Sequence, residues 1–464
     1  MGVVLRRKGL RIPVPSACGR CSMTGRPGSA HGRHAQREHP HGYAGPMGST
    51  VREVCEALLA GGALAEVLDE ELPHPDLEWA RSGAMALAGE PDGPPLLAPA
   101  PLATAARAAV ELLARLSGSA VLEGLDGAAL LGERAACFGH RRCGRVSPGG
   151  SCRLVRCADG WIAVNLARSD DVACLPAWFG EAPQGELWDF VETRAAARPV
   201  AELVGRARLL GMPVSPAAAV PARPEPWCGV PVRGGRLRRH PQARPFVVDL
   251  SSLWAGPLCA HLLGLAGARV LKVESPARPD GARRGNPHFF SLLNGNKECA
   301  VLEPGEFGDL LARADVVVEG SRPRALRQLG IDAEAAVRER PGLTWVGLSG
   351  HGRAEPGAEW VAFGDDAAAA AGLCAATGAP GAPSFCGDAV ADPLAGLHAA
   401  VAALASYRLG GGHLIDVSLA GVVRHLVARP GRTREGRVRE GPNGFEVEVG
   451  GAREPVLAPR ARPC

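Results

Sequence analysis

The chain has 464 residues, enough for two or three domains with a sizeable buried core. Its 52 basic and 48 acidic side chains give a formal net charge of +4, so the charge balance indicates neither a nucleic acid nor a membrane surface as a partner. The sequence has no run of 18 apolar residues and no secretory hydrophobic segment, and its 14 cysteines are scattered through apolar stretches. We therefore expect a cytoplasmic protein with reduced thiols.

Residues 1–46 are rich in arginine, glycine, proline, serine and histidine, with Glu38 as their one acidic residue. Cys18 and Cys21 precede four histidines, but the spacing matches no common zinc finger, so we expect no metal site. Because so little apolar content cannot form a core, we expect a disordered tail. A start at Met47 is the alternative explanation.

Residues 47–149 are predicted to form a helical segment, because helical periodicity runs through VREVCEALLAGGALAEVLDEEL and PLATAARAAVELLARL. In residues 150–216, SCRLVRCADGWIAVNLA predicts a hairpin with Asp159-Gly160 at its turn. Two helices follow, which makes this segment a small α+β domain. Residues 217–245 are rich in proline and arginine and are predicted to be a linker.

From residue 246 the pattern changes to alternating strands and helices. The first predicted strand is a continuous apolar run, which is typical of a buried parallel strand, and further strands are predicted at 315–320, 343–350 and 413–419. This alternation predicts an α/β fold with a parallel doubly wound sheet over residues 246–425. Residues 426–464 are expected to form a C-terminal tail.

The turn Leu253-Trp254-Ala255-Gly256 follows the first strand and precedes the first helix. Small residues there let a ligand approach the backbone, and a helix N-terminus favours an anion. The G-x-G-x-x-G pattern of dinucleotide-binding units is absent, although Glu274 ends the next strand, where a ribose-binding acid could lie. A nicotinamide-dependent dehydrogenase is therefore not favoured.

Asp388 and Asp392 precede a run of small apolar residues in CGDAVADPLAGLHAAVAAL, which predicts a buried helix. An ionised carboxylate beside such a helix is costly unless it is paired or functional. Asp392 has two interpretations: it caps the helix, with Pro393 at the first helical position, or it is a nucleophile. Asp388 is expected at the surface, in a strand or loop.

Six blocks between residues 246 and 425 carry a resemblance to a known family. They are VVDLSSLWAGPLCAHLLGLAGARVLKVE, LLNGNKECAVLE, LLARADVVVEGSRPRALRQLGID, LTWVGLSGHG, GDAVADPLAGLHAAVAALAS and GGGHLIDVSLAGVV. In this order they resemble the family III CoA-transferases, a group that includes formyl-CoA:oxalate and carnitine CoA-transferases and the α-methylacyl-CoA racemases. The resemblance implies a Rossmann-like large domain, a smaller domain and an interlocked homodimer. It also implies that Asp392 is the catalytic nucleophile.

The resemblance further implies that CoA and acyl-CoA bind as substrates, without a tightly bound cofactor. The implied CoA contacts are Leu253, Trp254, Ala255, Gly256, Asn296, Lys297 and Arg278. Lys297 is expected to meet a CoA phosphate, with a solvated surface lysine as the alternative. Arg278 and Arg283 are both possible replacements for the arginine that the family usually carries after its second strand.

The implied reaction moves CoA between an acyl-CoA and a carboxylic acid through a covalent aspartyl intermediate. An acyl-CoA racemase or isomerase is the alternative, and it needs a base on each face of the reacting carbon. Where that branch has a histidine, this chain has Asp365 and Asp366, which either cap a helix or line the site. His351 and His398 lie elsewhere in the sequence. A catalytically inactive CoA-binding paralogue is the other alternative.

Residues 82–116 resemble residues 371–404, which indicates a faint internal repeat. In the first copy the nucleophile position falls on Ala100 or Pro101, so this part resembles the rear of a degenerate large domain. The segment 150–216 resembles the small domain of the family, yet it precedes the large domain. Pairing of the two halves, within one chain or across a dimer, would rebuild the two-domain unit.

Overall fold

The computed structural model describes residues 51–68, 72–240, 243–431 and 433–463. The tail predicted at 1–46, with its possible zinc ligands, and the alternative start at Met47 lie outside the described residues. Within the described ranges, none of the helices has both the length and the apolar character that a membrane span requires.

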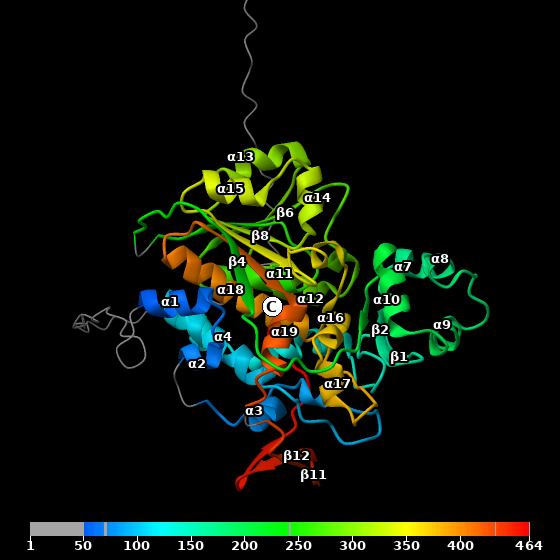
Figure 1. The fold of residues 1–464 in the computed structure, drawn as a ribbon. Coiled ribbons are helices and arrows are strands. Elements are labelled where there is room, and N and C mark those ends of the chain that lie inside the picture. Colours follow the sequence, from blue (N-terminus) through cyan, green and yellow to red (C-terminus); the bar gives the residue numbers. More distant parts are fainter. Residues whose placement is uncertain (1–50, 69–71, 241–242, 432, 464) are drawn as a thin grey trace, which may run out of the picture. The chain divides into compact units, whose positions relative to one another are not determined.

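A seven-stranded sheet forms the centre of the large domain (Figure 1). Its strands are β4 (Cys228–Arg233), β5 (Phe246–Asp249), β6 (Arg269–Glu274), β7 (Glu298–Val301), β8 (Val316–Glu319), β9 (Thr344–Ser349) and β10 (His413–Ser418). They lie in the order β4-β10-β9-β8-β5-β6-β7, and all neighbours are parallel except β4 and β10. Counted from β5 to β10, this is the 3-2-1-4-5-6 order of a Rossmann-like doubly wound sheet. The predicted α/β class is confirmed.

Helices cover both faces of this sheet. One face carries α11 (Ala255–Leu265), α12 (Pro287–Asn294), α18 (Ala391–Arg408) and α19 (Leu419–Val427), and the other carries α13 (Phe307–Leu311), α14 (Pro323–Gln328) and α15 (Ala333–Glu339). Successive side chains of a strand point to opposite faces. Val247 therefore enters the core with α11 and α18, whereas Val248 enters the core with α13 and α15. This double burial explains the continuous apolar runs that predict the strands.

Helix α18 is enclosed on all sides. Every residue from Pro393 to Tyr407 is buried. The helix packs against α11, α1 (Val51–Leu59) and α4 (Leu102–Ser117). Gly396 permits the close approach of α11, since a side chain there would collide with the Ala255 carbonyl oxygen. The Ala-rich composition of α18 follows from this packing, because a helix that is buried all round needs small apolar side chains on every face.

The N-terminal half packs against the large domain within one chain. Helices α4 and α18 lie in the two segments that resemble each other in sequence, and they pack against each other. The other helices of this half are α2 (Leu64–Leu68), α3 (Pro75–Arg81), α5 (Ala120–Glu123) and α6 (Glu133–Phe138). Helix α6 contributes a charged side chain, Arg134, to the candidate site.

Residues 150–216 contain a second, antiparallel sheet. It consists of β1 (Cys152–Arg156), β2 (Trp161–Asn165) and β3 (Val214–Pro216), and the helices beside it are α7 (Ser169–Ala173), α8 (Leu175–Phe179), α9 (Leu187–Ala196) and α10 (Val200–Leu209). Pairing of β1 with β2 confirms the hairpin predicted around Asp159-Gly160. Strands β2 and β3 contact α16 (Gly364–Ala370), so this segment meets the large domain within one chain.

The predicted linker at 217–245 contains β4, an edge strand of the main sheet. Pro231 is tolerated in this strand because an edge strand lacks a hydrogen-bonded neighbour on one side. Only Cys228 and Val232 are buried in it. With so few buried positions among prolines and arginines, the strand has no recognisable sequence pattern.

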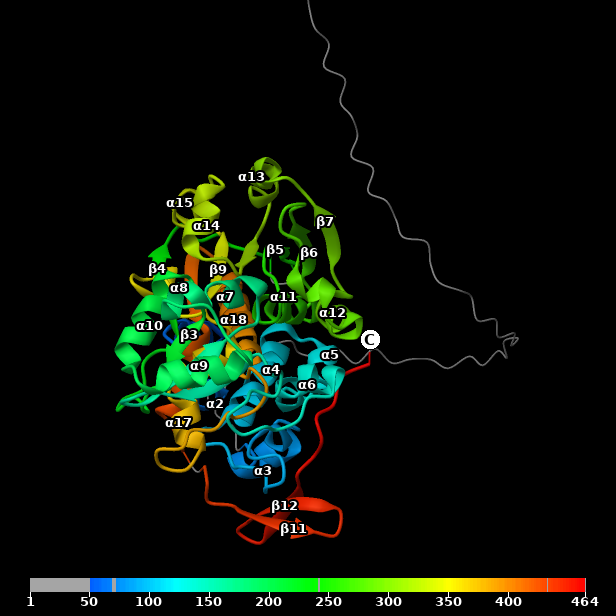
Figure 2. The same cartoon turned by 90° about the vertical axis from the view of Figure 1, so that its right-hand side faces the viewer.

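The C-terminal tail predicted at 426–464 is folded over much of its length. It forms a third sheet from β11 (Arg437–Gly441), β12 (Gly444–Val449) and β13 (Ala452–Pro455), and β12 and β13 contact α3 (Figure 2). Val447 of β12 is fully buried. The turn Gly450-Gly451 has positive φ at both residues, the conformation of a two-residue hairpin turn.

The described cysteines are free thiols, and most of them are buried. Burial raises the pKa of Cys55 and that of Cys228 to about 12. These thiols therefore stay protonated and unreactive near neutral pH. The burial of most described cysteines agrees with the expectation of buried thiols.

Candidate active site

Four aspartates gather where α16 and α18 begin. Asp365 and Asp366 lie in the first turn of α16, Asp388 precedes α18, and Asp392 lies in the first turn of α18. The Ala389 N–H donates a hydrogen bond of 2.9 Å to Asp365 Oδ1, which ties the two helix starts together. Within the described part of the chain, no group of histidines, cysteines or carboxylates is placed to hold a metal ion.

Asp388 is fully buried and is held by two basic side chains from the N-terminal half. Arg134 Nη1 lies 3.2 Å from Asp388 Oδ1, and His140 Nδ1 lies 3.2 Å from Oδ2. The expectation of a surface aspartate at 388 is therefore wrong. Arg134 belongs to α6 and His140 follows it, and the sequence predicts neither as a site residue. They precede the blocks that carry the family resemblance, and only the fold brings them here.

Replacing Asp388 by asparagine should destabilise the protein, because the Arg134 guanidinium and His140 would lose their counter-charge. We expect the free energy of unfolding at pH 7 to fall by roughly 1–3 kcal/mol, measured by chemical denaturation. Asp189→Asn is the matched control, since Asp189 is an exposed aspartate in the first turn of α9. If both variants were as stable as the wild type, the ion pair would contribute nothing to the fold.

Asp365 and Asp366 both have raised pKa values. Burial and the nearby Asp388 raise the pKa of Asp365 to about 6, and burial raises the pKa of Asp366 to about 8. Asp366 Oδ1 accepts the Phe363 N–H over 2.8 Å, which caps the start of α16. Of the two interpretations from sequence, capping thus fits Asp366, whereas Asp365 belongs to the aspartate cluster.

Asp392 is the aspartate of this cluster that keeps contact with solvent. Asp365, Asp366 and Asp388 are buried, whereas Asp392 is of intermediate exposure. Of the four residues, Asp392 is therefore the least enclosed by the protein.

Asp392 does not cap α18. The N-cap residue is Val390, and no side-chain hydrogen bond caps this helix. The Asp392 carboxylate instead accepts the Gly364 N–H at the start of α16. A side chain at Gly364 would collide with Asp392 Oδ2, so glycine is required for this approach. The capping interpretation thus fails, and the carboxylate is positioned by a neighbouring helix.

The pKa of Asp392 is raised to about 7. Burial is the main cause, and the charges of Asp365 and Asp388 add to it, whereas Arg134 and the Gly364 N–H oppose it. Near neutral pH the group is therefore divided between acid and carboxylate. The carboxylate that remains is more basic than that of an ordinary aspartate, which makes it a stronger nucleophile.

The predicted ligand-binding turn is linked to this cluster by Arg134. The Arg134 guanidinium lies 5.7 Å from the centroid of the Trp254 ring while it also pairs with Asp388. Trp254 is buried, and its ring meets Phe289 edge-on with centroids 5.5 Å apart. Arg134, which the sequence does not predict as a site residue, thus connects the predicted turn to Asp388 of the aspartate cluster.

Within this turn, Leu253 is the residue open to a ligand, with 43% of its surface exposed. It has a positive φ of 72°, and its N–H donates to Asp280 Oδ1 over 2.9 Å. Ala255 and Gly256 are buried in the start of α11. A side chain at Gly256 would collide with Ser251, so the close contact that requires this glycine lies within the protein.

Lys297 is buried, and protein groups use all its donors. Its Nζ donates to Asp249 Oδ2 and to Pro257 O, each over 2.8 Å, and to Asn294 Oδ1 over 2.9 Å. Since an ammonium group has three protons, none remains for a phosphate. The structure therefore supports neither role expected from the sequence. Lys297 instead ties the end of β5 to the start of α11.

Asn296 and Arg278 remain accessible. Asn296 is exposed, although its side chain makes two hydrogen bonds to His261. Asn296 Oδ1 lies 2.9 Å from His261 Nδ1, and Asn296 Nδ2 donates to the His261 carbonyl oxygen over 3.3 Å. Arg283 pairs with Glu274 over 2.6 Å. Glu274 is the acid that the sequence offers for binding a ribose, and this ion pair occupies its carboxylate. Arg278 is exposed and has no ion pair among the described residues. Of the two arginines considered, Arg278 is the one available to a phosphate.

His351 and His398 are poor candidates for the bases of a racemase. The His398 ring meets Trp227 with centroids 5.0 Å apart, and the His351 ring meets Trp360 at 5.4 Å. Burial lowers the pKa of His398 to about 3 and that of His351 to about 4. Both rings are too weakly basic to remove a carbon-bound proton near neutral pH. His140 is the described histidine that pairs with an aspartate of the cluster.

A family model described as CoA-transferase family III matches residues 246–459. Over these residues the chain is similar to CoA-transferase family III. The match begins at β5 and contains the turn at 253–256 and the four clustered aspartates. Arg134 and His140 lie outside it, so the candidate site combines the matched region with a preceding segment.

Two curated relatives show the extent of the similarity. An acetyl-CoA:oxalate CoA-transferase from Acetobacter aceti is 32% identical over 192 residues, which cover 38% of this chain and 49% of that protein. A succinyl-CoA–D-citramalate CoA-transferase from Chloroflexus aurantiacus is 31% identical over 191 residues, 37% of this chain and 48% of that protein. The chain thus spans about half the length of the curated relatives it matches.

A solved structure of a CaiB/BaiF family protein from Brucella suis is 26% identical to this chain, with a TM-score of 0.40. The alignment covers 45% of this chain and 65% of that protein.

Proposed function

We propose that this protein is an enzyme that transfers CoA from an acyl-CoA to a carboxylic acid, with Asp392 as the covalent nucleophile. The family III match and the names of the relatives support the reaction class. The observation that carries the choice of residue is the intermediate exposure of Asp392 beside three buried aspartates.

In the proposed reaction, a carboxylate oxygen of Asp392 attacks the thioester carbonyl carbon. The C–S bond breaks, which releases CoA thiolate and leaves a mixed anhydride on Asp392. The thiolate then attacks the aspartyl carbonyl, which frees the first acid and forms an aspartyl-CoA thioester. The acceptor carboxylate reverses these two steps, so acceptor acyl-CoA leaves and the Asp392 carboxylate is regenerated.

The surroundings of Asp392 suit these steps. The Gly364 N–H already donates to its carboxylate, and a backbone donor at that position can stabilise negative charge that develops on the aspartyl oxygen. Asp392 also lies at the N-terminus of α18, where the helix dipole favours a negative charge. For CoA, we propose the exposed Leu253 turn, Asn296 and Arg278 as contacts.

Intact-protein mass spectrometry tests the proposal. Incubation with a panel of acyl-CoAs should produce a covalent CoA adduct that is absent from Asp392→Asn. An inactive paralogue would bind CoA without an adduct or transfer. A racemase would exchange the α-proton of an acyl-CoA for solvent deuterium without transferring CoA. Either of these results would overturn the proposed function.

We also propose that the protein is a homodimer, interlocked as the family resemblance implies. Light scattering at micromolar concentration should give twice the chain mass of 48.0 kDa. A monomer that transfers CoA at full rate would contradict this expectation.

A further inference from the structure

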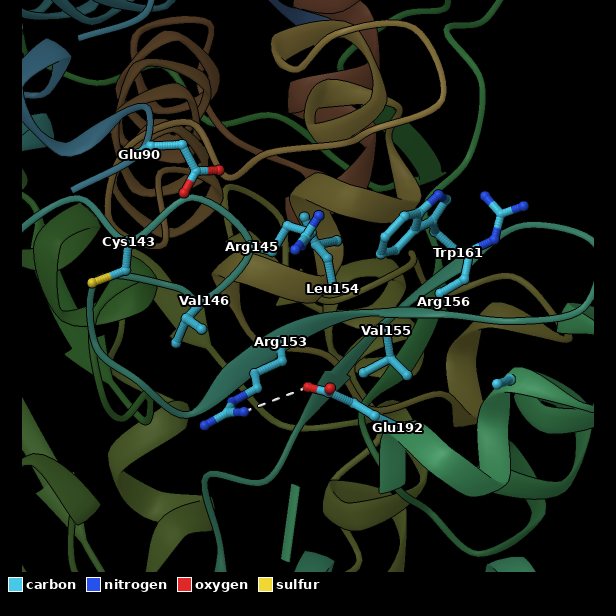
Figure 3. A pocket seen from close by; sticks show the side chains of 11 residues that line it. Glu90, Cys143, Arg145, Val146, Arg153, Leu154, Val155, Arg156, Trp161 and Glu192 are labelled. Carbon is cyan, nitrogen blue, oxygen red and sulfur yellow. Dashed lines mark hydrogen bonds and ion pairs between the residues drawn. The ribbon is translucent and has the colours of Figure 1, made fainter. Parts of the chain in front are cut away.

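A cavity of about 370 Å³ lies between the small domain and the segment that precedes it, and none of the four clustered aspartates lines it. Its walls are the loop from Cys143 to Val146, strand β1 and Trp161 at the start of β2, with Glu90 and α9 beside them (Figure 3). Small-molecule sites commonly have volumes of about 300–1,000 Å³. The cavity is thus large enough for a small metabolite.

The charges that line this cavity are unevenly paired. Arg153 pairs with Glu192 over 3.5 Å, and Figure 3 shows this pair on one side of the hollow. The guanidinium groups of Arg145 and Arg156 have no hydrogen bond or ion pair with any described residue. Glu90 likewise has no side-chain partner in the described structure. Two cations and one carboxylate therefore remain uncompensated, which leaves a positive cavity.

Arg145 and Arg156 share one aromatic ring. Their guanidinium carbons lie 5.6 Å and 5.5 Å from the centroid of Trp161. Cation–π attraction holds each group against the indole without using its N–H donors, so these donors remain available. Two like charges around one ring repel each other, and a bound anion would relieve the repulsion.

The backbone beneath these side chains is fixed by hydrogen bonds. Arg156 and Trp161 are paired residues of the β1–β2 hairpin, and the Trp161 indole N–H donates to Gly381 O over 3.0 Å. The Arg145 carbonyl oxygen accepts the Leu154 N–H of β1 over 2.9 Å. A ligand would therefore meet groups whose backbone is already ordered, which lowers the entropy lost on binding.

We propose that Arg145, Arg156 and Trp161 form a second ligand site, which binds a small organic oxyanion. Guanidinium forks bind carboxylate and phosphate alike in a bidentate manner. The nearby Glu90 opposes a large polyanion, so the site fits a ligand with one or two negative charges. This assignment does not depend on the chemistry at Asp392.

Calorimetric titration at low ionic strength tests the site, with inorganic phosphate and succinate as separate probes. At least one probe should bind the wild type, and Arg145→Gln/Arg156→Gln should weaken that binding by about tenfold or more. Arg313→Gln is the matched control, because Arg313 is exposed and does not line the cavity. It should bind the probe as the wild type does.

The same titration distinguishes this site from the proposed active site. Asp392→Asn should bind the probe normally, and saturating CoA should not displace it. Binding by neither probe, equal binding by the double variant, or displacement by CoA would overturn the proposal.

Modification of the wild-type protein gives a second test that does not rely on a variant that folds. Phenylglyoxal reacts with accessible guanidinium groups, and peptide mass spectrometry locates the modified arginines. The bound probe should slow modification of Arg145 and Arg156 but not that of Arg313. Equal rates at all three residues with and without the probe would show that the anion does not occupy this cavity.

Discussion

Replacing Asp392 by asparagine is expected to reduce CoA transfer by about 10³-fold or more, because an amide cannot form the acyl anhydride. Asparagine has nearly the same shape, and its carbonyl oxygen can still accept the Gly364 N–H. CoA affinity should therefore stay close to that of the wild type. Initial transfer rates and CoA titration, measured on the same preparations, check both expectations.

The same substitution should stabilise the protein above neutral pH. The pKa of Asp392 is about 7 in the fold, against an ordinary value of 3.8. Between these values the folded state holds a proton that the unfolded chain releases, so stability falls as the pH rises through this window. Asparagine does not ionise and avoids this loss. Thermal unfolding should show a gain for Asp392→Asn at pH 8 and little change at pH 4.

A suitable control for the Asp392 variant is Asp189→Asn, which should keep wild-type transfer and stability. Hydroxylamine added during turnover should modify the peptide that contains Asp392. If the label appeared on Asp365, Asp366 or Asp388, or if Asp392→Asn transferred CoA normally, another residue would be the nucleophile.

The parts of the fold that sequence predicts are those where burial leaves a periodic pattern. Both Val247 and Val248 are buried, on opposite faces of the sheet, and such pairs produced the apolar runs behind the strand predictions. Strand β4 buries only two side chains at an edge, and its sequence resembles a linker. The C-terminal sheet exposes most of its residues, so its alternation is weak.

Some residues of the candidate site can be predicted from local sequence patterns, and others cannot. Asp392 and the turn at 253–256 carry local sequence patterns, and Arg134 lies beside both Trp254 of that turn and Asp388 of the aspartate cluster. Arg134 and His140 carry no such pattern, because they meet Asp388 across about 250 positions of the chain. For Lys297 the local pattern is misleading, because its sequence block suggests a ligand contact. In the fold, its ammonium group donates to Asp249, to the Pro257 carbonyl oxygen and to Asn294 Oδ1, so it has no proton left for a ligand.

Arg134→Gln should shift the pH profile of CoA transfer toward higher pH. The groups that act on Asp392 are Asp365 and Asp388, which raise its pKa, and Arg134 and the Gly364 N–H, which lower it. Loss of the arginine removes the strongest of the opposing influences. An opposite charge nearby is worth roughly 1–3 pKa units. The rate below the new pKa should fall about tenfold per unit and should recover in more alkaline buffer.

A conservative variant separates this charge effect from a loss of packing. Arg134→Lys keeps the positive charge but not the guanidinium fork beside Trp254 and Asp388, so it should retain a pH profile close to that of the wild type even if it is less stable. Arg313 is an exposed arginine far along the chain. Arg313→Gln should change neither the pH profile of CoA transfer nor the stability. If Arg134→Gln and Arg134→Lys lost the same activity at every pH, Arg134 would act only through packing. The charge of Arg134 would then have no influence on the pKa of Asp392.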